Sequence, residues 1–292
     1  MLTVGLDVGG TSVRAALVDQ GGAVLDTTRV PTPTDGAALE DAVAVAVTGL
    51  TGAHRVGAVG LAVAGFVSRD QRSVGFSPHL PWRDVPVAER IEQRLGVPVL
   101  LEHDANAAAM AEYRLGAAAG SRVALLLALG TGIGGALVVD GELFRGAHGV
   151  APELGHLQLV PEGRHCPCGK RGCWERYCSG SALKIADRLG RSGCEVALAA
   201  ENGDPAACAA VAELACWLGA GLALAADVYD PDVVVIAGGL SASAPLFLDD
   251  AREHYVARVT GAGHRPLAEL RVAQLGPAAG MVGVALLARS LV

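Results

Sequence analysis

Short apolar runs recur along the chain, and the first two end at clusters of glycine or polar residues. Residues 2–8 run into Gly9-Gly10-Thr11, and residues 13–18 run into a turn signal at 19–22. This pattern predicts a strand, a glycine turn, a second strand, a further turn and a third strand. Other apolar runs predict strands at residues 56–63, 97–101, 123–129, 136–139 and 232–236.

Alanine- and leucine-rich stretches lie between these strands and favour helices. They cover residues 37–50, 105–115, 206–227 and 279–291. The alternation of strands and helices is typical of an α/β protein. The longest apolar stretches, such as Val123 to Leu129, are too short to cross a bilayer, so we expect no membrane-spanning segment.

The pattern of strand, glycine turn and strand occurs twice. Val123 to Leu129 meets a second glycine turn, and laying Gly9 on Gly130 places Ala15 on Ala136 and Asp19 on Asp140. Two copies about one domain apart predict a duplication with a cleft between the halves. We expect a small domain at residues 1–118, onto which a C-terminal helix at 279–292 packs back, and a large domain at residues 119–278.

Composition and charge narrow the class of protein. The 292 residues are 51% hydrophobic and 18% charged, which is typical of a globular chain that buries a sizeable core. The net charge is −7 and the sequence has no run rich in Lys and Arg, so we expect no nucleic acid partner. The N-terminus lacks the basic and apolar regions of a signal peptide, which predicts a cytoplasmic protein.

Three glycine turns follow apolar strands. Glycine lets backbone N–H groups approach a bound anion, and threonine adds a hydroxyl donor. Two such turns that face each other would hold the phosphates of one nucleotide; the alternative is that each turn is only a tight hairpin. The candidate phosphate-binding residues are Gly9, Gly10, Thr11, Gly130, Thr131, Gly132, Gly134, Gly238 and Gly239.

Two aspartates stand at predicted strand ends. Asp7 would organise Mg²⁺ or its water shell beside the phosphates, or would instead cap the glycine turn. Asp104 comes directly before a predicted helix, where it would accept a proton from a sugar hydroxyl that attacks a γ-phosphoryl group. The alternative for Asp104 is the N-cap of that helix.

Metal-binding residue types gather in the irregular stretch 151–180. Cys166, Cys168 and Cys173 combine with His156 into a Cys₃His set, the composition of a structural zinc site. His165 is a competing ligand, although its position next to Cys166 makes joint ligation awkward. The alternative for this set is a group of reduced surface thiols. The other four of the seven cysteines are scattered, and we expect them to be packed or idle thiols.

Two glutamates, Glu153 and Glu175, flank this set. They mark the two ends of the predicted zinc loop, residues 153–175. A metal ion in the loop would hold both carboxylates rigidly enough to accept hydrogen bonds from sugar hydroxyls. The alternative is that both are solvent-facing charges.

Together these motifs resemble the ROK sugar kinases, most closely the bacterial glucokinases among them, over essentially the whole chain. The resemblance is carried by Asp7-Val-Gly-Gly-Thr11, Leu129-Gly-Thr-Gly-Ile-Gly-Gly135, Asp104-Ala-Asn106, Glu153-Leu-Gly-His156 and Cys166-Pro-Cys-Gly-Lys-Arg-Gly-Cys-Trp-Glu175. It implies a duplicated ribonuclease-H-like fold of the actin/hexokinase type, with two domains that flank a cleft. It also implies ATP with Mg²⁺ as the phosphoryl donor, and a homodimer or homotetramer.

The activity that the resemblance implies is transfer of the ATP γ-phosphoryl group to the 6-hydroxyl of a hexose such as glucose. Asp104 would be the base, Gly65 would lie beside the sugar, and Glu153, His156 and Glu175 would contact it, with His156 also a zinc ligand. Two positions depart from the family pattern: His103 replaces an Asn, and Val63-Ala-Gly-Phe66 replaces Gly-x-Pro-Gly. We expect the imidazole of His103 to keep the hydrogen bond of the Asn it replaces, because both groups offer one donor and one acceptor.

The sequence also allows other functions. The ROK family also contains sugar-responsive repressors, which carry a helix-turn-helix domain ahead of the kinase-like body; here the phosphate motif already begins at Asp7. Among kinases, the substrate could instead be fructose, mannose or N-acetylmannosamine, and the donor could be polyphosphate.

Overall fold

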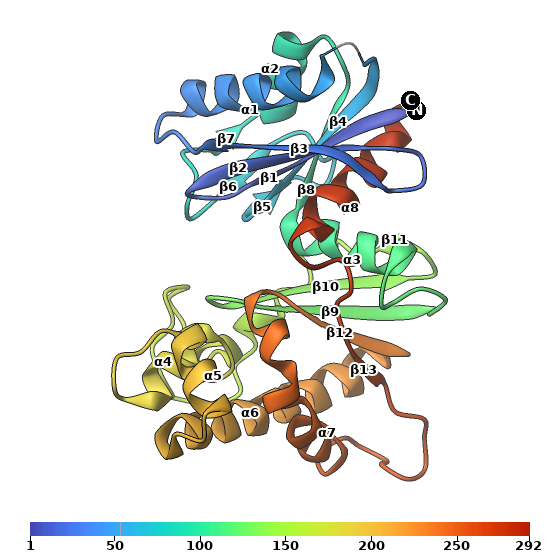
Figure 1. The fold of residues 1–292 in the computed structure, drawn as a ribbon. Helices are drawn as coiled ribbons and strands as arrows, with labels where there is room; N and C mark the ends of the chain where they lie inside the picture. Colours follow the sequence, from blue (N-terminus) through green and yellow to red (C-terminus); the bar gives the residue numbers. More distant parts are fainter. Residues whose placement is uncertain (53) are drawn as a thin grey trace. The chain divides into compact units, whose positions relative to one another are not determined.

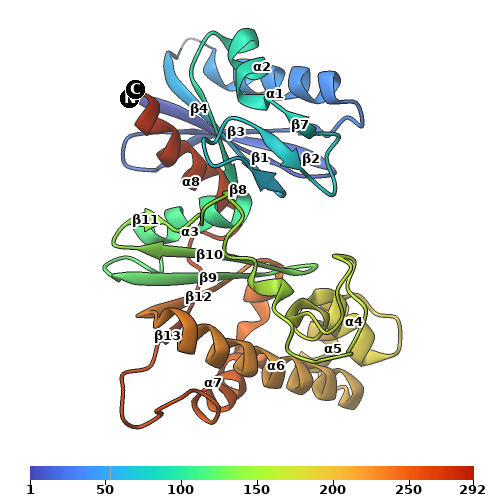
Figure 2. The ribbon, with the colours of Figure 1, turned by 180° about the vertical axis from the view of Figure 1, so that it is seen from behind.

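The computed structural model describes residues 1–52 and 54–292, which group into two compact units (Figures 1 and 2). Unit 1 comprises Met1–Ala119, Glu142–Pro152 and Leu275–Val292, and unit 2 comprises Gly120–Gly141 and Glu153–Gln274. The segment 142–152 therefore groups with the N-terminal part of the chain although it lies far along the sequence.

Unit 1 contains a five-stranded sheet in the order β3-β2-β1-β4-β8. Its strands are β1 (Leu2–Val8), β2 (Ser12–Val18), β3 (Val24–Pro31), β4 (Val56–Val63) and β8 (Val99–His103). β1 pairs antiparallel with β2 and parallel with β4, which pairs parallel with β8. The predicted strands are thus present, but β8 extends to His103, two residues beyond the predicted end.

Several short strands were not predicted: three form a small sheet in unit 1, and one lies at the edge of the other five-stranded sheet. They are β5 (Phe66–Val67), β6 (Val74–Phe76) and β7 (Arg83–Val85), which form a small sheet in that order, and β11 (Glu142–Leu143). Strands of two or three residues leave no run of alternating apolar positions that a pattern can detect.

Unit 2 repeats the strand pattern of unit 1. Its strands are β9 (Val123–Leu129), β10 (Ile133–Val139), β12 (Val233–Ala237) and β13 (Glu269–Val272). β9 pairs antiparallel with β10 and parallel with β12, which pairs parallel with β13. The order β10-β9-β12-β13 matches β2-β1-β4-β8 strand for strand, so the predicted duplication is confirmed.

The two hairpins differ in the length of their glycine turns. Val8 pairs with Val13, whereas Leu129 pairs with Ile133, so the second turn is one residue shorter. The ungapped alignment of the two copies was therefore wrong by one residue beyond the turn. As a result β10 begins at Ile133 rather than Ala136, and Gly134 lies within a strand instead of in the turn.

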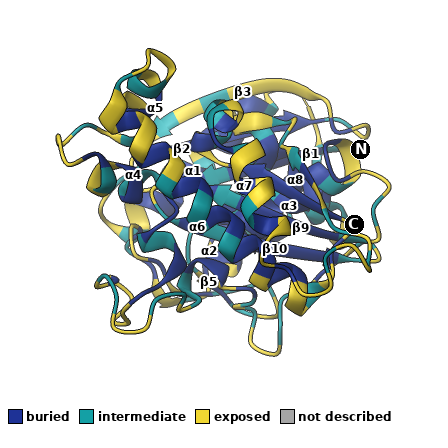
Figure 3. Ribbon diagram, turned by 90° about the horizontal axis from the view of Figure 1, so that it is seen from below, coloured by how far each residue is buried: buried dark blue, intermediate teal, exposed yellow. Residues whose placement is uncertain are grey.

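Helices cover both faces of the first sheet. They are α1 (Gly36–Thr51), α2 (Val87–Leu95), α3 (Asp104–Leu115) and α8 (Ala279–Ala288). Side chains alternate between the two faces of a strand, so β4 directs Leu61 toward α1 and α2 and directs Ala62 toward α3 and α8. The small residues on this second face let α8 approach closely, and α8 is largely dark blue, the colour of burial, in Figure 3.

Unit 2 has its own core, built on its longest helix. The helices are α4 (Gly180–Asp187), α5 (Gly193–Glu201), α6 (Pro205–Tyr229) and α7 (Leu248–Val256), of which only α6 was predicted. Asp204 caps α6 by accepting the N–H of Ala207 at 2.8 Å. Leu214 and Leu218 of α6 pack with Leu127 of β9 in the core.

The α6 helix corrects the expectation about membrane spans. By length and composition it is apolar enough to cross a membrane, so the statement that every apolar stretch is too short was wrong for this helix. The protein buries 56% of its most apolar window, and Leu214, Leu218 and Leu222 lie in the core of unit 2. Packing as a core helix therefore accounts for its apolar composition.

The close packing of α8 generates a first prediction. A Cβ at Gly283 would lie 1.7 Å from the carbonyl oxygen of Ala107 on α3, whereas a Cβ at Gly280 would meet nothing within 4 Å. Gly283→Ala should lower the midpoint of urea unfolding, because overpacking costs about 1–3 kcal/mol. Gly280→Ala is the control and should hold or raise the midpoint, because alanine favours a helix by about 1 kcal/mol over glycine. Equal midpoints for the two variants would contradict this packing.

Candidate active site

Parallel pairing brings three strand ends of unit 1 to one edge of the sheet. Val8 lies opposite Val63, and Val63 lies opposite His103. The residues around these strand ends, which include Asp7, Gly65 and Asp104, therefore lie at the same edge. Open α/β sheets place their ligand sites at this carboxyl edge.

Asp7 forms an ion pair with Arg14 on the neighbouring strand β2. Burial raises the pKa of the Asp7 carboxyl; the guanidinium of Arg14 opposes this shift, and the negative charge of Asp104 adds to it. Because the donor to Asp7 is a guanidinium rather than an amide of the turn, the capping alternative loses support. Two carboxylates that repel each other suit a bound cation. Arg14 was missed in the sequence, where its signal was a charge inside an apolar run.

Asp104 is the first residue of α3, and its side chain is 46% exposed. The N-cap is His103, so the alternative that Asp104 caps the helix was wrong. Asp104 Oδ1 accepts the N–H of Ala105 at 2.7 Å, and His103 Nε2 lies 3.3 Å from the same oxygen. The Asp104 carboxylate therefore lies in the first turn of α3 and is open to solvent.

Hydrogen bonds with Ser12 of β2 and with Thr32, the residue after β3, hold the glycine turn of unit 1. Gly9 N donates to Ser12 O at 3.2 Å, and Thr32 Oγ1 donates to Gly9 O at 2.6 Å. Gly10 and Thr11 at the tip of the turn are exposed. The turn is therefore held at its base, while its tip remains accessible to a ligand.

Gly65 lies in the turn between β4 and β5. A Cβ there would lie 2.4 Å from the carbonyl oxygen of Phe76, and Ser77 Oγ donates to Ala64 O at 2.7 Å across the same contact. The close approach of two backbone segments thus explains the glycine at this position. Its place beside a sugar stays a prediction.

Sequence reasoning also missed Glu102, two residues before Asp104. Glu102 is only 2% exposed and forms an ion pair with Arg145 at 2.6 Å. The signal in the sequence was a carboxylate directly after the apolar run 97–101, at a position where the strand continues.

The second and third glycine turns are neighbours within unit 2. β9 and β12 pair in parallel, and a Cβ at Gly238 would lie 2.5 Å from the carbonyl oxygen of Leu129. Gly238 has a φ of 82°, a left-handed conformation that glycine adopts readily. Thr131 and Gly239 are exposed on these two turns. Unit 2 therefore presents two accessible backbone turns side by side.

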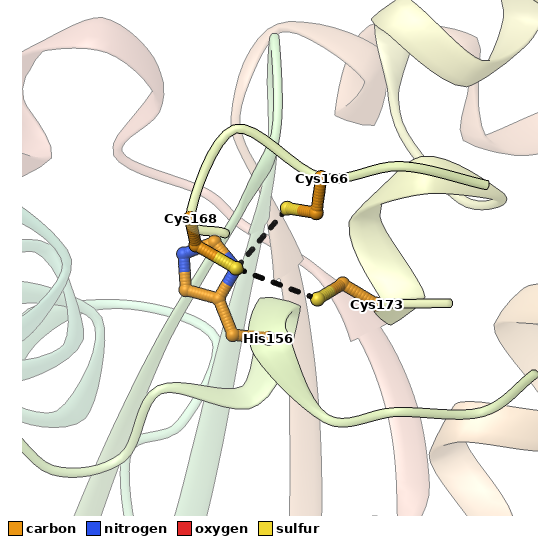
Figure 4. A group of neighbouring side chains, drawn as sticks. All are labelled: His156, Cys166, Cys168 and Cys173. Carbon is orange, nitrogen blue, oxygen red and sulfur yellow. Dashed lines mark hydrogen bonds between the residues drawn. The ribbon is translucent and has the colours of Figure 1, made fainter. Parts of the chain in front are cut away.

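The predicted metal ligands converge in unit 2, as Figure 4 shows. The ligand atoms of His156, Cys166, Cys168 and Cys173 all lie within 4.8 Å of one another. Cys166 Sγ is 3.8 Å from His156 Nδ1, and Cys168 Sγ is 3.6 Å from Cys173 Sγ. Tetrahedral ligation with Zn–S bonds of about 2.3 Å separates two sulfurs by about 3.8 Å, so the four side chains fit such an ion. His165, the competing ligand, is exposed and lies outside this group.

Trp174 anchors the cluster loop in the core of unit 2. It is fully buried, and its Nε1 donates to Trp217 O of α6 at 2.9 Å. A Cβ at Gly221 of α6 would lie 2.0 Å from its ring, so the indole packs directly on the helix backbone. The residues on either side, Cys173 and Glu175, are therefore held in fixed positions.

Glu175 joins the cluster to the second glycine turn. Its Oε1 lies 3.1 Å from Cys166 Sγ and 3.6 Å from His156 Nδ1. A Cβ at Gly132 would lie 2.3 Å from its Oε2. Glu153 is exposed, with an oxygen 3.9 Å from His156 Nε2. The turn, the cluster and both glutamates thus form one packed group in unit 2.

Comparison with known proteins adds the family. The ROK family model matches residues 3–290. The chain belongs to the ROK family.

The relatives of this ROK protein include enzymes and regulators. It is 43% identical over 309 aligned residues to the glucokinase of Streptomyces coelicolor, with 99% of this chain and 98% of that protein covered. A solved ROK family glucokinase from Streptomyces griseus, in complex with glucose and AMPPNP, is 41% identical with a TM-score of 0.89, covering 99% of this chain and 100% of that one. The xylose repressor of Bacillus subtilis is 31% identical over 69% of this chain and 53% of its own length. The likeness to the solved glucokinase confirms the duplicated ribonuclease-H-like fold of the actin/hexokinase type.

Proposed function

We propose that this ROK protein is an ATP-dependent glucokinase, which transfers the γ-phosphoryl group of ATP to the 6-hydroxyl of glucose. The observation that carries the proposal is the half-exposed Asp104 carboxylate at a strand edge, in a chain 43% identical to the glucokinase of Streptomyces coelicolor. The solved relative that binds glucose and AMPPNP supports both the sugar and the nucleotide as ligands.

Asp104 would act as the general base. The 6-oxygen of glucose attacks the γ-phosphorus, the bond to the bridging β–γ oxygen breaks, ADP leaves, and the hydroxyl proton passes to the carboxylate. One oxygen of Asp104 already accepts the Ala105 N–H, which fixes the orientation of the carboxylate on α3. A sugar hydroxyl can reach the group because it is exposed.

The glycine turns would bind the phosphates of ATP. Exposed backbone N–H groups in such turns are good anion donors. The residues proposed for this role are Gly9, Gly10 and Thr11 in unit 1, with Gly130, Thr131, Gly132, Gly238 and Gly239 in unit 2. Mg²⁺ bound with ATP would neutralise phosphate charge. Asp7 fits a place beside that ion, because a nearby cation would relieve the cost of its ionised form.

Unit 2 would supply the remaining sugar contacts. We propose that Glu153, His156 and Glu175 accept and donate hydrogen bonds to sugar hydroxyls, together with His103 and Gly65 of unit 1. Zinc at the Cys₃His cluster would be structural, because four protein ligands complete its coordination. Its effect on the sugar would pass through Glu175, which contacts Cys166 and His156.

The sugar and the donor are tested by one coupled assay. Glucose, fructose, mannose and N-acetylmannosamine would each be offered with ATP and with polyphosphate. We expect the highest kcat/KM for glucose with ATP. Preference for another hexose or for polyphosphate would correct the substrate, and no phosphorylation of any sugar would favour a sugar-responsive regulator, as in the repressor relative.

Asp104→Asn tests the base. We expect kcat to fall about 10²–10⁴-fold, the usual contribution of a general base. Glucose binding should change less, because Asn keeps the shape and one acceptor of the side chain. Near-normal turnover in a folded Asp104→Asn protein would remove Asp104 from the proton transfer.

His103 gives a second test on the sugar side. His103→Ala should weaken glucose binding by about 1–3 kcal/mol, the cost of a hydrogen bond lost in a desolvated site. His103→Asn should bind glucose nearly as well as the wild type, because an amide also offers a donor and an acceptor. The measurement is the glucose dissociation constant of each variant. If the alanine variant bound glucose normally, the imidazole of His103 would contact Asp104 but not the sugar.

Metal content tests the zinc proposal. We expect about one zinc ion per chain in the purified protein, as a closed Cys₃His site holds one ion. Cys168→Ser should lose the metal and raise the KM for glucose, while ATP binding largely survives. Cys194→Ser is the matched control, because Cys194 is exposed and lies outside the cluster. Fully active protein without zinc would refute the proposal.

Assembly and location remain predictions. The family resemblance predicts a homodimer or homotetramer, which light scattering would measure directly. The cytoplasmic location predicted from the N-terminal sequence is likewise to be tested, by cell fractionation.

A further inference from the structure

Glu102 is a buried carboxylate that receives hydrogen bonds from several sides of unit 1. It is 2% exposed, although burial of a carboxylate without partners would be costly. Its two oxygens serve different parts of the unit. Oε1 accepts the backbone N–H of His103 and the Nδ2 of Asn106, each at 2.9 Å. Oε2 accepts Gln71 Nε2 at 2.9 Å and Arg145 Nε at 2.8 Å.

The Oε1 contacts hold the start of α3. His103 is the N-cap residue and Asn106 lies in the first turn, so the two donors bracket Asp104 on the chain. Asn106 is itself buried, and its Oδ1 has no hydrogen-bond partner among the described residues. Its amide is therefore oriented through Glu102, which ties the first helical turn to the strand that precedes it.

The Oε2 contacts hold the segment 142–152. Arg145 also places its Nη2 2.6 Å from Glu102, and its guanidinium is largely covered. The rest of the segment lies close to the β5 region: Arg69 Nη1 donates to Ala147 O at 3.4 Å, and a Cβ at Gly149 would lie 2.5 Å from Val67 O. This segment runs directly into Glu153, one of the residues proposed to bind the sugar.

We propose that Glu102 is a positioning residue that fixes the base Asp104 and, through Arg145, the segment that leads to Glu153. The inference rests on the proposed function, in which Asp104 takes the proton and Glu153 contacts the sugar. Glu102 itself need not touch the substrate. Its role is to keep the helix start and the segment in one arrangement during phosphoryl transfer.

Glu102→Gln should break one of the contacts that Glu102 makes with His103 and Arg145. A Gln side chain has one oxygen and one NH₂ group, whereas all partners of Glu102 donate. Asn106 and Gln71 can turn their amides to accept from the NH₂ group. The His103 N–H and the Arg145 guanidinium cannot, because neither has an acceptor. One of these two contacts is therefore lost in either orientation of the Gln.

Steady-state kinetics of Glu102→Gln test the proposal. We expect kcat to fall about 10- to 100-fold, because a misplacement on the order of 1 Å in an active site can cost 10²-fold. The KM for ATP should stay within about twofold, since the glycine turns are untouched. Glu112→Gln is the matched control: Glu112 is also buried on α3, but it accepts the N–H groups of Ala117 and Leu275 at the other end of the helix, each at 2.8 Å.

The control separates positioning from stability. Both variants should melt at a lower temperature, but Glu112→Gln should keep its kcat within about twofold because it leaves the Asp104 end of α3 intact. A folded Glu102→Gln protein with the kcat of Glu112→Gln would overturn the proposal. If Glu102→Gln does not fold, the kcat values of Arg145→Gln and Arg145→Lys test the positioning role instead.

The Arg145 variants act on the less buried partner. Arg145→Gln should lower kcat, and Arg145→Lys should recover part of the loss because lysine keeps the charge without the planar fork. Wild-type kcat in Arg145→Gln would also overturn the proposal. Asp104→Asn measured in parallel separates failure of the proposed function from failure of the positioning role. If Asp104→Asn retains activity, the proposed general base is wrong. If Asp104→Asn is inactive while Glu102→Gln has normal kcat, only the positioning role of Glu102 is wrong.

Discussion

The parallel register of β1, β4 and β8 is the constraint on which the candidate site of unit 1 depends. Because Val8, Val63 and His103 lie in one row, the residues around three distant strand ends share one sheet edge. Asp7, Gly65 and Asp104 come from positions far apart in the sequence, and no local interaction would bring them together. The negative charge of Asp104 helps to raise the pKa of the Asp7 carboxyl. The register thus gathers two carboxylates and a glycine turn at one sheet edge, where we propose that a cation and a phosphate bind.

In unit 2 the same topology is combined with close backbone packing. Gly132 leaves room for Glu175, and Gly155 leaves room for the Ile133 carbonyl oxygen, which a Cβ would approach to 2.4 Å. The N–H of Gly180 donates to Gly130 O at 2.8 Å. These contacts join the second glycine turn and the cysteine cluster in one packed group. Trp174 ties the whole group to α6.

Much of this arrangement could be predicted from the sequence, and the exceptions have physical reasons. The glycine turns, Asp104 and the Cys₃His set each carry a local pattern, and the motifs led to the correct family. The register of β10 could not be predicted, because a turn shortened by one residue leaves the glycine pattern intact. The role of Glu102 was also missed, because its partners Gln71 and Arg145 are distant in the sequence and meet it only in the folded unit. Likewise, nothing in the sequence pairs Arg14 with Asp7 before the β1–β2 register is known.

A crystal structure of the protein with glucose and a non-hydrolysable ATP analogue would test the central claim most directly. The expected result is a sugar whose 6-hydroxyl lies within about 2.6–3.2 Å of an Asp104 oxygen, the reach of a general base, and in line with the γ-phosphate. Hydrogen bonds from the sugar to Glu153, His156 and Glu175 should complete the site. A sugar bound with its 6-hydroxyl away from Asp104, or phosphates bound away from the glycine turns, would contradict the proposed mechanism.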